Sequence, residues 1–260
     1  MKQDKVPSWM GRTQLMTGED PIIKLMNSHV LIAGLGGVGG IAAEMLVRAG
    51  IGKITIVDSD TVDETNRNRQ IPALKSTEGK LKTEVMAERL LDINPALNLV
   101  IKTVYLRDNI TDQILEESKP DYAVDCIDTL SPKVNYLIKC LSMGIPIVSS
   151  MGAGGKIDPT RLLVDDISKS RHCNLARYVR KRLRTLGVYK GIKVVYSPEL
   201  ADPAKIIQAP EGNVKKSFIG TMSYMPAVFG CTVASVVIRD LSGVKEYRPT
   251  PARVPKPKST

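Results

Sequence analysis

Residues 29–60, HVLIAGLGGVGGIAAEMLVRAGIGKITIVDSD, decide the fold of this chain. The apolar run at 30–33 is typical of a buried strand, and it leads directly into a glycine-rich turn. An apolar helix follows the turn, and residues 54–57 form a second apolar run. The order of strand, glycine turn, helix and strand predicts a nucleotide-binding βαβ unit.

The glycines of this turn have different expected roles. Gly34 and Gly36 let the backbone turn tightly and approach a phosphate, and Gly39 lets the helix pack close to the strand. Asp58 ends the second strand, where a ribose hydroxyl would lie. A turn of this kind most often binds a dinucleotide such as NAD, so the turn alone does not identify the ligand.

The rest of the chain continues the alternation of strand and helix. Alternation at this spacing predicts an α/β fold with a Rossmann-like, doubly wound, mainly parallel sheet and a smaller C-terminal α+β extension. A segment at 161–164, after a glycine-rich corner, predicts a strand of different direction. We expect strands at 99–104, 121–128, 145–149 and 192–197, and helices at 79–93, 110–118, 131–143, 173–186 and 225–241.

Three units are expected along the chain. Residues 12–165 form the nucleotide-binding domain, and residues 166–243 form an extension with a basic helix and an apolar core or dimer helix. The tail at 244–260 is rich in proline and basic residues and is predicted to be disordered. Before the first strand, a helix at 12–27 is expected to break at Pro21, and residues 198–216 are expected to form a loop.

Composition restricts the partners and the compartment. The chain of 260 residues carries a net charge of +10, which favours a polyanionic partner such as nucleic acid. Its four cysteines are scattered without a C-x-x-C pair, which argues against a zinc site or a disulfide scaffold. We expect a cytoplasmic protein without a membrane anchor, because the apolar stretches are shorter than a span.

The segment 168–193 has nine lysines and arginines and no acidic residue. On its helix, one face is apolar, with Leu175, Val179, Leu183 and Leu186, and the opposite face is basic. A basic stripe is typical of contact with a phosphate backbone, although many such stripes are only solvated. The residues predicted to bind RNA are Arg177, Arg180, Lys181 and Arg184.

A second cluster of polar residues follows the strand ends near the glycine turn. Asn66, Arg69, Gln70 and Lys82 supply two cations and two amides, which is more positive charge than a nicotinamide requires. A triphosphate requires such charge where an α-phosphate is attacked and pyrophosphate leaves. Asp128, after the fourth strand, is a candidate ligand for the Mg²⁺ that accompanies ATP.

These residues together resemble the ubiquitin-activating, molybdopterin- and thiamine-biosynthesis adenylyltransferase superfamily. The resemblance spans roughly residues 12–165 and implies a Rossmann-like fold, usually dimeric, that adenylates carboxylates with ATP. The residues that carry it are Arg12, Gly34, Gly36, Gly37, Gly39, Asp58, Asp60, Asn66, Arg69, Gln70, Lys82, Asp125 and Asp128.

Within the superfamily, longer blocks are most similar to the tRNA threonylcarbamoyladenosine dehydratase family and extend the resemblance to about residue 241. These blocks are residues 12–18, 65–70, 84–89, 150–160 and 173–177. The reaction so implied is ATP-dependent ring closure of the threonylcarbamoyl group on the adenosine 3′ of a tRNA anticodon. Activation of the threonyl carboxylate is followed by attack from the substrate's own carbamoyl group, so no catalytic cysteine is needed.

The same resemblance implies roles for individual residues. Gly36 and Asp58 would hold the adenosine, and Asp128 would bind magnesium. Arg12 would reach the ATP of the other subunit of a homodimer. Catalysis would rest on Arg12, Arg69, Lys82 and Asp128, and ATP would be bound by Gly34, Gly36, Gly37, Gly39, Asp58, Asp60, Asn66, Arg69, Gln70 and Lys82.

Three other functions remain open from the sequence. The runner-up is an adenylyltransferase for a ubiquitin-like or sulfur-carrier protein, in which Cys173 would carry a thioester or sulfur. Such enzymes commonly have paired C-x-x-C motifs, which this chain lacks. A nucleotide-sensing RNA-binding module and a nicotinamide dehydrogenase are less favoured, because the phosphate-binding cations are present and no hydride-transfer site is recognisable. We expect Cys126 and Cys231 to be packing residues.

Overall fold

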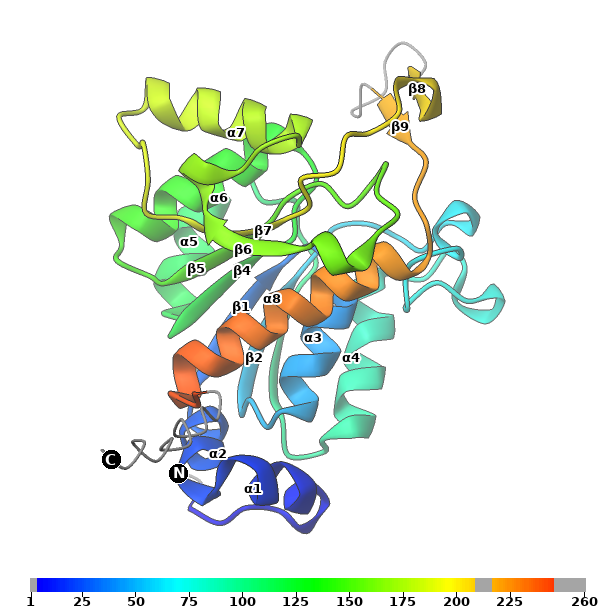
Figure 1. The fold of residues 1–260 in the computed structure, drawn as a ribbon. Helices are drawn as coiled ribbons and strands as arrows, with labels where there is room; N and C mark the ends of the chain where they lie inside the picture. Colours follow the sequence, from blue (N-terminus) through cyan, green and yellow to red (C-terminus); the bar gives the residue numbers. More distant parts are fainter. Residues whose placement is uncertain (1–3, 209–216, 246–260) are drawn as a thin grey trace, which may run out of the picture.

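The computed structural model describes residues 4–208 and 217–245 and is built on one seven-stranded sheet (Figure 1). The strand order is β3-β2-β1-β4-β5-β7-β6, and every neighbouring pair is parallel except β6 with β7. The predicted Rossmann-like, mainly parallel sheet is therefore confirmed, as is the change of direction near residue 163. The strands are β1 His29–Ala33, β2 Lys53–Val57, β3 Asn98–Lys102, β4 Tyr122–Asp125, β5 Ile147–Ser150, β6 Leu163–Asp166 and β7 Lys193–Tyr196.

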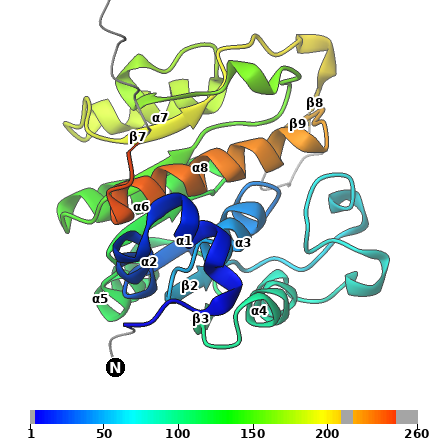
Figure 2. The ribbon, with the colours of Figure 1, turned by 60° about the horizontal axis from the view of Figure 1, so that its bottom comes forward.

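Helices cover both faces of the sheet (Figures 1 and 2). One layer consists of α3 Gly39–Arg48, α4 Lys82–Ile93 and α8 Tyr224–Ser242, and the other of α5 Asp108–Ser118, α6 Leu130–Ser142 and α7 Asn174–Thr185. Two short helices, α1 Gly11–Thr17 and α2 Glu19–Met26, lie at the amino edge of the sheet before β1.

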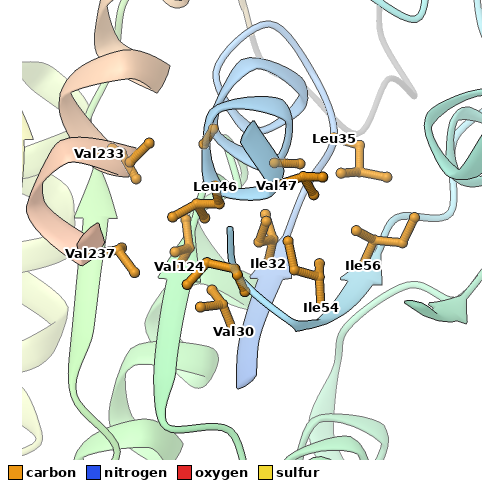
Figure 3. Close-up of a cluster of buried hydrophobic side chains, with 14 of the residues drawn as sticks. Val30, Ile32, Leu35, Leu46, Val47, Ile54, Ile56, Val124, Val233 and Val237 are labelled. Carbon is orange, nitrogen blue, oxygen red and sulfur yellow. The ribbon is translucent and has the colours of Figure 1, made fainter. Parts of the chain in front are cut away.

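The alternation of side chains along the strands separates two hydrophobic clusters. Val30 and Ile32 of β1 point to the α3–α4–α8 side, and Leu31 and Ala33 point to the α5–α6–α7 side. Figure 3 shows the first cluster, in which strand side chains meet α3 and α8. Both faces are covered, so the strands read as continuous apolar runs in the sequence.

Helix α8 packs closely along α3 because small residues line their contact. A Cβ placed on Gly230 would be 2.5 Å from the carbonyl oxygen of Val38 and 2.8 Å from Cβ of Ile41. At the other end of α8, Asp240 accepts a hydrogen bond of 2.7 Å from the Tyr122 hydroxyl and pairs with Lys193 at 2.5 Å. The C-terminal segment thus shares the core of the N-terminal half.

Among the described residues, α8 is the one helix long and apolar enough to meet the length and composition of a membrane span. Half of its most apolar window is buried against the rest of the chain. Core helices meet the same criterion, and the packing of α8 on α3, α2 and β5 is that of a core helix.

The prediction for the N-terminal helix was wrong in its break point. The interruption is at Gly18, whose φ is +82°, and not at Pro21. Pro21 lies in the first turn of α2, where backbone N–H groups have no acceptor within the helix. The absence of an N–H in proline therefore breaks no hydrogen bond there. Glycine adopts the left-handed backbone conformation without steric cost, so it separates the two helices.

Three further predictions were wrong in detail. Leu186 is exposed, because α7 ends at Thr185 and the chain turns away at Gly187, whose φ is +78°. Residues 198–216 are not wholly a loop, since β8 (Ile206–Gln208) pairs antiparallel with β9 (Ser217–Ile219). Cys231 is exposed, since it faces away from the side of α8 that packs on α3.

The predicted disordered tail at 244–260 lies outside the described residues beyond Lys245. The same is true of residues 209–216 between β8 and β9.

Replacing Gly230 with alanine is expected to lower the free energy of unfolding by about 1–3 kcal/mol, because the methyl group overpacks the α3–α8 contact. Gly11→Ala is the matched control, since a Cβ at Gly11 meets nothing within 4 Å. Urea unfolding followed by circular dichroism measures both variants. Equal midpoints for Gly230→Ala and Gly11→Ala would show that the close approach of α8 to α3 is not required.

Candidate active site

The candidate site lies where the strand order reverses. From β1 the chain crosses to β2 on one side, and later it returns to β4 on the other side of β1. Ligands of open α/β sheets bind at the carboxyl ends of the strands next to such a switch point. The glycine turn follows the carboxyl end of β1 at this position, as predicted.

The glycine turn is sterically demanding. Gly34 has φ of +91°, and a Cβ there would be 2.9 Å from the carbonyl oxygen of Cys126, which follows β4. A Cβ on Gly39 would overlap the carbonyl oxygen of Gly34, at 1.8 Å. Glycine at these two positions is therefore needed to bring the start of α3 against the ends of β1 and β4.

Asp58 connects the end of β2 to this turn. Its carboxylate accepts hydrogen bonds from the backbone N–H of Leu35, at 2.6 Å, and of Asp60, at 2.8 Å. Burial raises the pKa of the Asp58 carboxyl, and these two hydrogen bonds and Lys82 oppose the increase. Each carboxylate oxygen keeps a further lone pair, which can accept from a hydroxyl such as that of a ribose.

The segment between β2 and α4 folds back over the glycine turn. The side chain of Gln70 lies over Gly36, with Nε2 3.7 Å from the position of a Cβ, and the carbonyl of Arg69 lies 3.0 Å from that position at Gly37. Oε1 of Gln70 is buried and accepts no hydrogen bond within the described structure. A buried hydrogen-bond acceptor beside the glycine-rich turn fits a ligand that brings its own hydrogen-bond donors.

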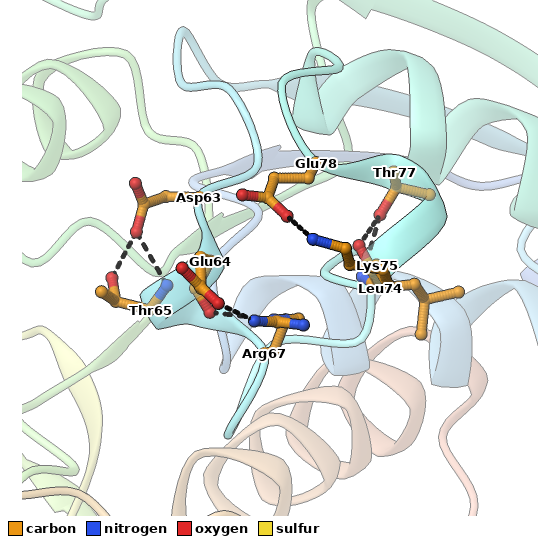
Figure 4. A network of polar contacts seen from close by, with 8 residues as sticks. All are labelled: Asp63, Glu64, Thr65, Arg67, Leu74, Lys75, Thr77 and Glu78. Atoms are coloured by element: carbon orange, nitrogen blue, oxygen red, sulfur yellow. Dashed lines mark hydrogen bonds and ion pairs between the residues drawn. The ribbon is translucent and has the colours of Figure 1, made fainter.

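The outer part of this segment is held by its own polar contacts (Figure 4). Asp63 accepts hydrogen bonds from both the N–H and the hydroxyl of Thr65, and Glu64 pairs with Arg67. The Thr77 hydroxyl accepts from the N–H of Leu74 at 2.9 Å. These local bonds fix the outer turns of the segment whose residues Arg69 and Gln70 lie against the glycine turn.

Two predicted phosphate ligands differ in how they are held. Lys82 is the first residue of α4, is nearly fully buried, and pairs with the exposed Asp60 at 2.9 Å. Arg69 is half-buried and donates to the carbonyl of Thr65 and to Oδ1 of Asn68. Among the described residues Arg69 has no ion-pair partner, so its charge remains available to an anion.

The two carboxylates after β4 have separate environments. Asp125 is fully buried and pairs with Lys133 of α6 at 2.8 Å, while the Ser149 hydroxyl donates to it at 2.5 Å. Lys133 also donates to the carbonyls of Ile127, at 2.9 Å, and Ser150, at 2.7 Å. Asp128 is exposed beyond this cluster.

Lys133 was not identified from the sequence. Its signal is a lysine on the apolar stripe of α6, three and four residues before Tyr136 and Leu137. A charge at such a position requires a buried partner, and Asp125 at the end of the adjacent strand is the acid within reach.

The residues fit magnesium only in combination with a phosphate. No group of three or more histidine, cysteine or acidic side chains that would form a metal site occurs in the described part of the chain. Mg²⁺ is commonly held by one or two carboxylates together with substrate phosphates, and the exposed Asp128 suits that arrangement.

Arg12 is not part of this site within one chain. It is exposed on α1, and the neighbouring Met10 packs against Gly50 and Ile22 at the amino edge of the sheet. The glycine turn lies at the opposite, carboxyl edge. Arg12 can therefore serve such a site only in another copy of the chain.

The predicted RNA-binding residues lie on α7. Arg177, Lys181 and Arg184 are exposed, whereas Arg180 is half-buried and donates to the hydroxyl of Ser170. Burial lowers the pKa of Arg180, and the nearby Arg184 adds to this effect. Arg180 is thus the least accessible of the four residues.

The environments of two cysteines argue against a catalytic thiol. Cys173 is the buried N-cap of α7, as expected for a structural residue that begins a helix. Cys126 follows β4, and burial raises the pKa of its thiol to about 12. The thiolate is the reactive form of cysteine, so a raised pKa makes Cys126 unreactive.

Comparison with known proteins places this geometry in a family. The ThiF family model matches residues 11–257. The tRNA threonylcarbamoyladenosine dehydratase of Bacillus subtilis (strain 168) is 38% identical over 237 residues, which are 88% of this chain and 93% of that protein. The chain belongs to the ThiF family and to its tRNA threonylcarbamoyladenosine dehydratases.

Solved structures agree with this assignment. The Escherichia coli tRNA N6-threonylcarbamoyladenosine dehydratase in complex with ATP superposes with a TM-score of 0.82 at 33% identity, covering 94% of this chain and 97% of that one. The same protein has been solved in complex with AMP. The fold and the recognised family therefore agree with the sequence prediction.

The runner-up function is represented more distantly. An adenylyltransferase and sulfurtransferase from Vanderwaltozyma polyspora is 36% identical over 166 residues, which are 60% of this chain and only 37% of that protein. The dehydratase of Bacillus subtilis is matched over 93% of its own length, so the dehydratase assignment is favoured.

Replacing Lys133 with methionine is expected to lower the free energy of unfolding by about 3–5 kcal/mol, because the Asp125 carboxylate stays buried without its partner. Adding Asp125→Asn is expected to recover part of the loss, since the amide carries no charge. Chemical denaturation of both variants measures the difference. A loss below about 1 kcal/mol for Lys133→Met would contradict the role given to this pair.

Proposed function

We propose that this protein uses ATP to close the threonylcarbamoyl group of a modified tRNA adenosine into a ring, with loss of one water. One observation carries the proposal: the glycine turn at the switch point is covered by Gln70 and Arg69. We call the glycine turn at 34–39 together with Arg69 and Gln70 the nucleotide cradle. The chain that contains it is 38% identical to a dehydratase relative and covers 93% of that protein. The ATP and AMP complexes of the Escherichia coli dehydratase support a nucleotide in the same place.

The residues in and around the nucleotide cradle have different chemical roles. Gly34 and Gly36 let the backbone turn and approach the nucleotide, Gly37 and Gly39 let the turn pack closely against Pro226 and the end of β1, and Asp58 accepts from the ribose. Gln70 and Asn66 supply amides, and Arg69 and Lys82 supply positive charge to the phosphates. Asp60 is the carboxylate that pairs with Lys82, so it positions the lysine ammonium at the start of α4.

The proposed chemistry begins at the threonyl carboxylate of the tRNA. A carboxylate oxygen attacks the α-phosphorus of ATP, the bond to the pyrophosphate oxygen breaks, and Arg69 and Lys82 neutralise the developing charge. The carbamoyl group of the same substituent then attacks the activated carbonyl and gives up one proton to solvent, and AMP leaves with the carboxylate oxygen. Attacker and acyl group are tethered, so positioning replaces a catalytic nucleophile.

Magnesium and the compartment belong to the same proposal. Asp128 would hold Mg²⁺ together with the ATP phosphates, and the ion would supply positive charge to those phosphates. The four cysteines are free thiols, which supports a reducing compartment such as the cytoplasm.

A homodimer is part of the proposal, and the exposed position of Arg12 on α1 supports it. Helix α1 buries no residue, and its Leu15 and Met16 are 90% and 84% exposed. Exposed apolar side chains of this size favour a protein interface. A second copy that covers α1 would bring Arg12 toward the ATP of its partner.

Replacing Lys82 with alanine is expected to lower kcat/KM by about 10²–10³, because a charge aimed at the transition state is lost. Lys75→Ala is the control, since Lys75 is an exposed cation of the same segment. The assay combines protein, ATP, magnesium and modified tRNA and follows the loss of one water from the nucleoside by mass spectrometry. If folded wild-type protein produces no mass change in the nucleoside, the proposed function is refuted.

Subunit complementation tests the role of Arg12. Arg12→Ala and Lys82→Ala are each expected to be inactive, whereas co-expressed and co-purified chains should recover about a quarter of wild-type activity, because half of the dimers are mixed and each has one intact site. If mixing restores no activity while both variants remain dimeric, Arg12 does not act across the interface.

A further inference from the structure

A second cationic hollow lies on the same edge of the sheet as the glycine turn. It has a volume of about 350 Å³ and is lined by Arg161, Arg171, His172, Pro198 and Leu200. Its walls come from the segments that leave β5, precede β6 and α7, and follow β7. None of these residues belongs to the nucleotide cradle described above.

The two arginines of the hollow form no direct ion pair with any residue that the structure describes. Hydrogen bonds from Thr160 lower the pKa of the Asp158 carboxyl, and Asp158 lies close enough to Arg161 for the arginine charge to help lower it. The carboxylate of Asp158 is bound by the N–H and hydroxyl of Thr160, at 2.9 and 2.6 Å. Glu199 accepts from the N–H of Ile157 at 3.1 Å and from the hydroxyl of Ser197 at 3.1 Å.

A buried lysine holds the walls of the hollow together. Lys156, which is 3% exposed, donates to the carbonyl of His172 at 3.2 Å and to the carbonyl of Glu199. Burial lowers the pKa of Lys156, and the nearby Arg161 acts in the same direction. His172 has φ of +56°, a conformation that a non-glycine residue adopts only when its surroundings impose it.

The position of the hollow relates it to both predicted sites. Strand β7 is three strands away from β1, so its carboxyl end lies about 14 Å from the glycine turn at the usual strand spacing of about 4.8 Å. Helix α7 begins two residues after His172, and its exposed Arg177 and Lys181 continue the positive charge. The hollow therefore lies at the start of α7, on the same edge of the sheet as the nucleotide cradle.

We propose that this hollow binds a nucleotide of the tRNA that flanks the modified adenosine, with a phosphate on Arg161 and Arg171. The inference rests on the proposed function, because it assumes that the substrate is an RNA. Two guanidinium groups supply paired donors for phosphate oxygens, and the apolar surfaces of Pro198 and Leu200 offer contact to a ribose or base. A volume of this size lies in the range that accommodates small ligands.

The test compares Arg161→Ala/Arg171→Ala with Lys24→Ala/Arg239→Ala, which removes the same charge at the opposite edge. Binding of an anticodon stem–loop RNA carrying threonylcarbamoyladenosine is followed by fluorescence anisotropy without ATP. The arginine variant is expected to bind about 10-fold more weakly. Its plot of log affinity against log salt should be shallower by about one unit, while the control changes neither.

Neutral methylphosphonates at each phosphate of the anticodon loop locate the contact. One substitution should weaken binding by the wild type and leave the Arg161→Ala/Arg171→Ala variant unchanged, which is the signature of a direct pair. Arg161→Lys/Arg171→Lys should keep the salt dependence and lose part of the affinity, because lysine lacks the planar fork.

Three outcomes would overturn the inference. Equal RNA affinity in the arginine and control variants would show that the hollow does not contact RNA. Loss of binding to ATP or inorganic phosphate with unchanged RNA affinity would assign the hollow to a free anion. A uniform effect of all methylphosphonates in both proteins would exclude a defined phosphate contact.

Failure of the proposed function is detected separately. Wild-type protein that binds the RNA through these arginines and never removes water from its nucleoside would refute the dehydratase proposal and retain the hollow as an RNA site. If the wild-type protein removes water and the arginine variants keep an unchanged KM for tRNA, the dehydratase proposal is retained and the proposal of an RNA site in the hollow is refuted.

Discussion

The buried ion pair between Asp125 and Lys133 is the contact on which the site depends most. Lys133 binds the Asp125 carboxylate and the carbonyls of Ile127 and Ser150, so one ammonium joins the ends of β4 and β5 to α6. Removing two charges from water is costly, and only complete hydrogen bonding offsets the cost. The Ser149 hydroxyl and the N–H of Ile127 complete the set around Asp125. The backbone that leads to Asp128 is thereby fixed beside the glycine turn.

The carboxyl edge of the sheet combines this fixed backbone with positive charge. Close contacts at Gly34 and Gly39 bring the start of α3 against the ends of β1 and β4, while Arg69 and Lys82 supply the charge that a triphosphate requires. The same edge also holds Arg161 and Arg171 in the second hollow, and α7 presents the exposed Arg177, Lys181 and Arg184. A long, cationic edge suits a substrate whose reactive carboxylate is attached to a polyanion, and it exceeds what a small carboxylic acid would need.

Much of the fold followed from the sequence because local rules and tertiary packing agree in the central sheet. The apolar runs predict buried strands and the glycine-rich stretch predicts a tight turn, and the folded chain contains both at these positions. The closeness of Gly36 and Gln70 was also predictable, because the segments that hold them follow the carboxyl ends of the adjacent parallel strands β1 and β2.

Predictions failed where tertiary packing decided, as for Lys133 and Cys231, and where a local rule on proline was misapplied, as for Pro21. Lys133 is an ordinary helix residue by sequence, and only the facing Asp125 makes it structural. Gly18 rather than Pro21 separates the first helices, since proline is harmless in a first helical turn. Cys231 lies on an apolar helix with one side packed, and the sequence did not show which side.

The most direct test of the account follows the oxygen atoms of the substrate. A tRNA whose threonyl carboxylate carries ¹⁸O at both oxygens is incubated with the protein, ATP and magnesium, and the phosphate products are analysed by mass spectrometry. Activation at the α-phosphate predicts one ¹⁸O atom in AMP for each dehydrated nucleoside. A dehydrated nucleoside formed without ¹⁸O in AMP would contradict the account.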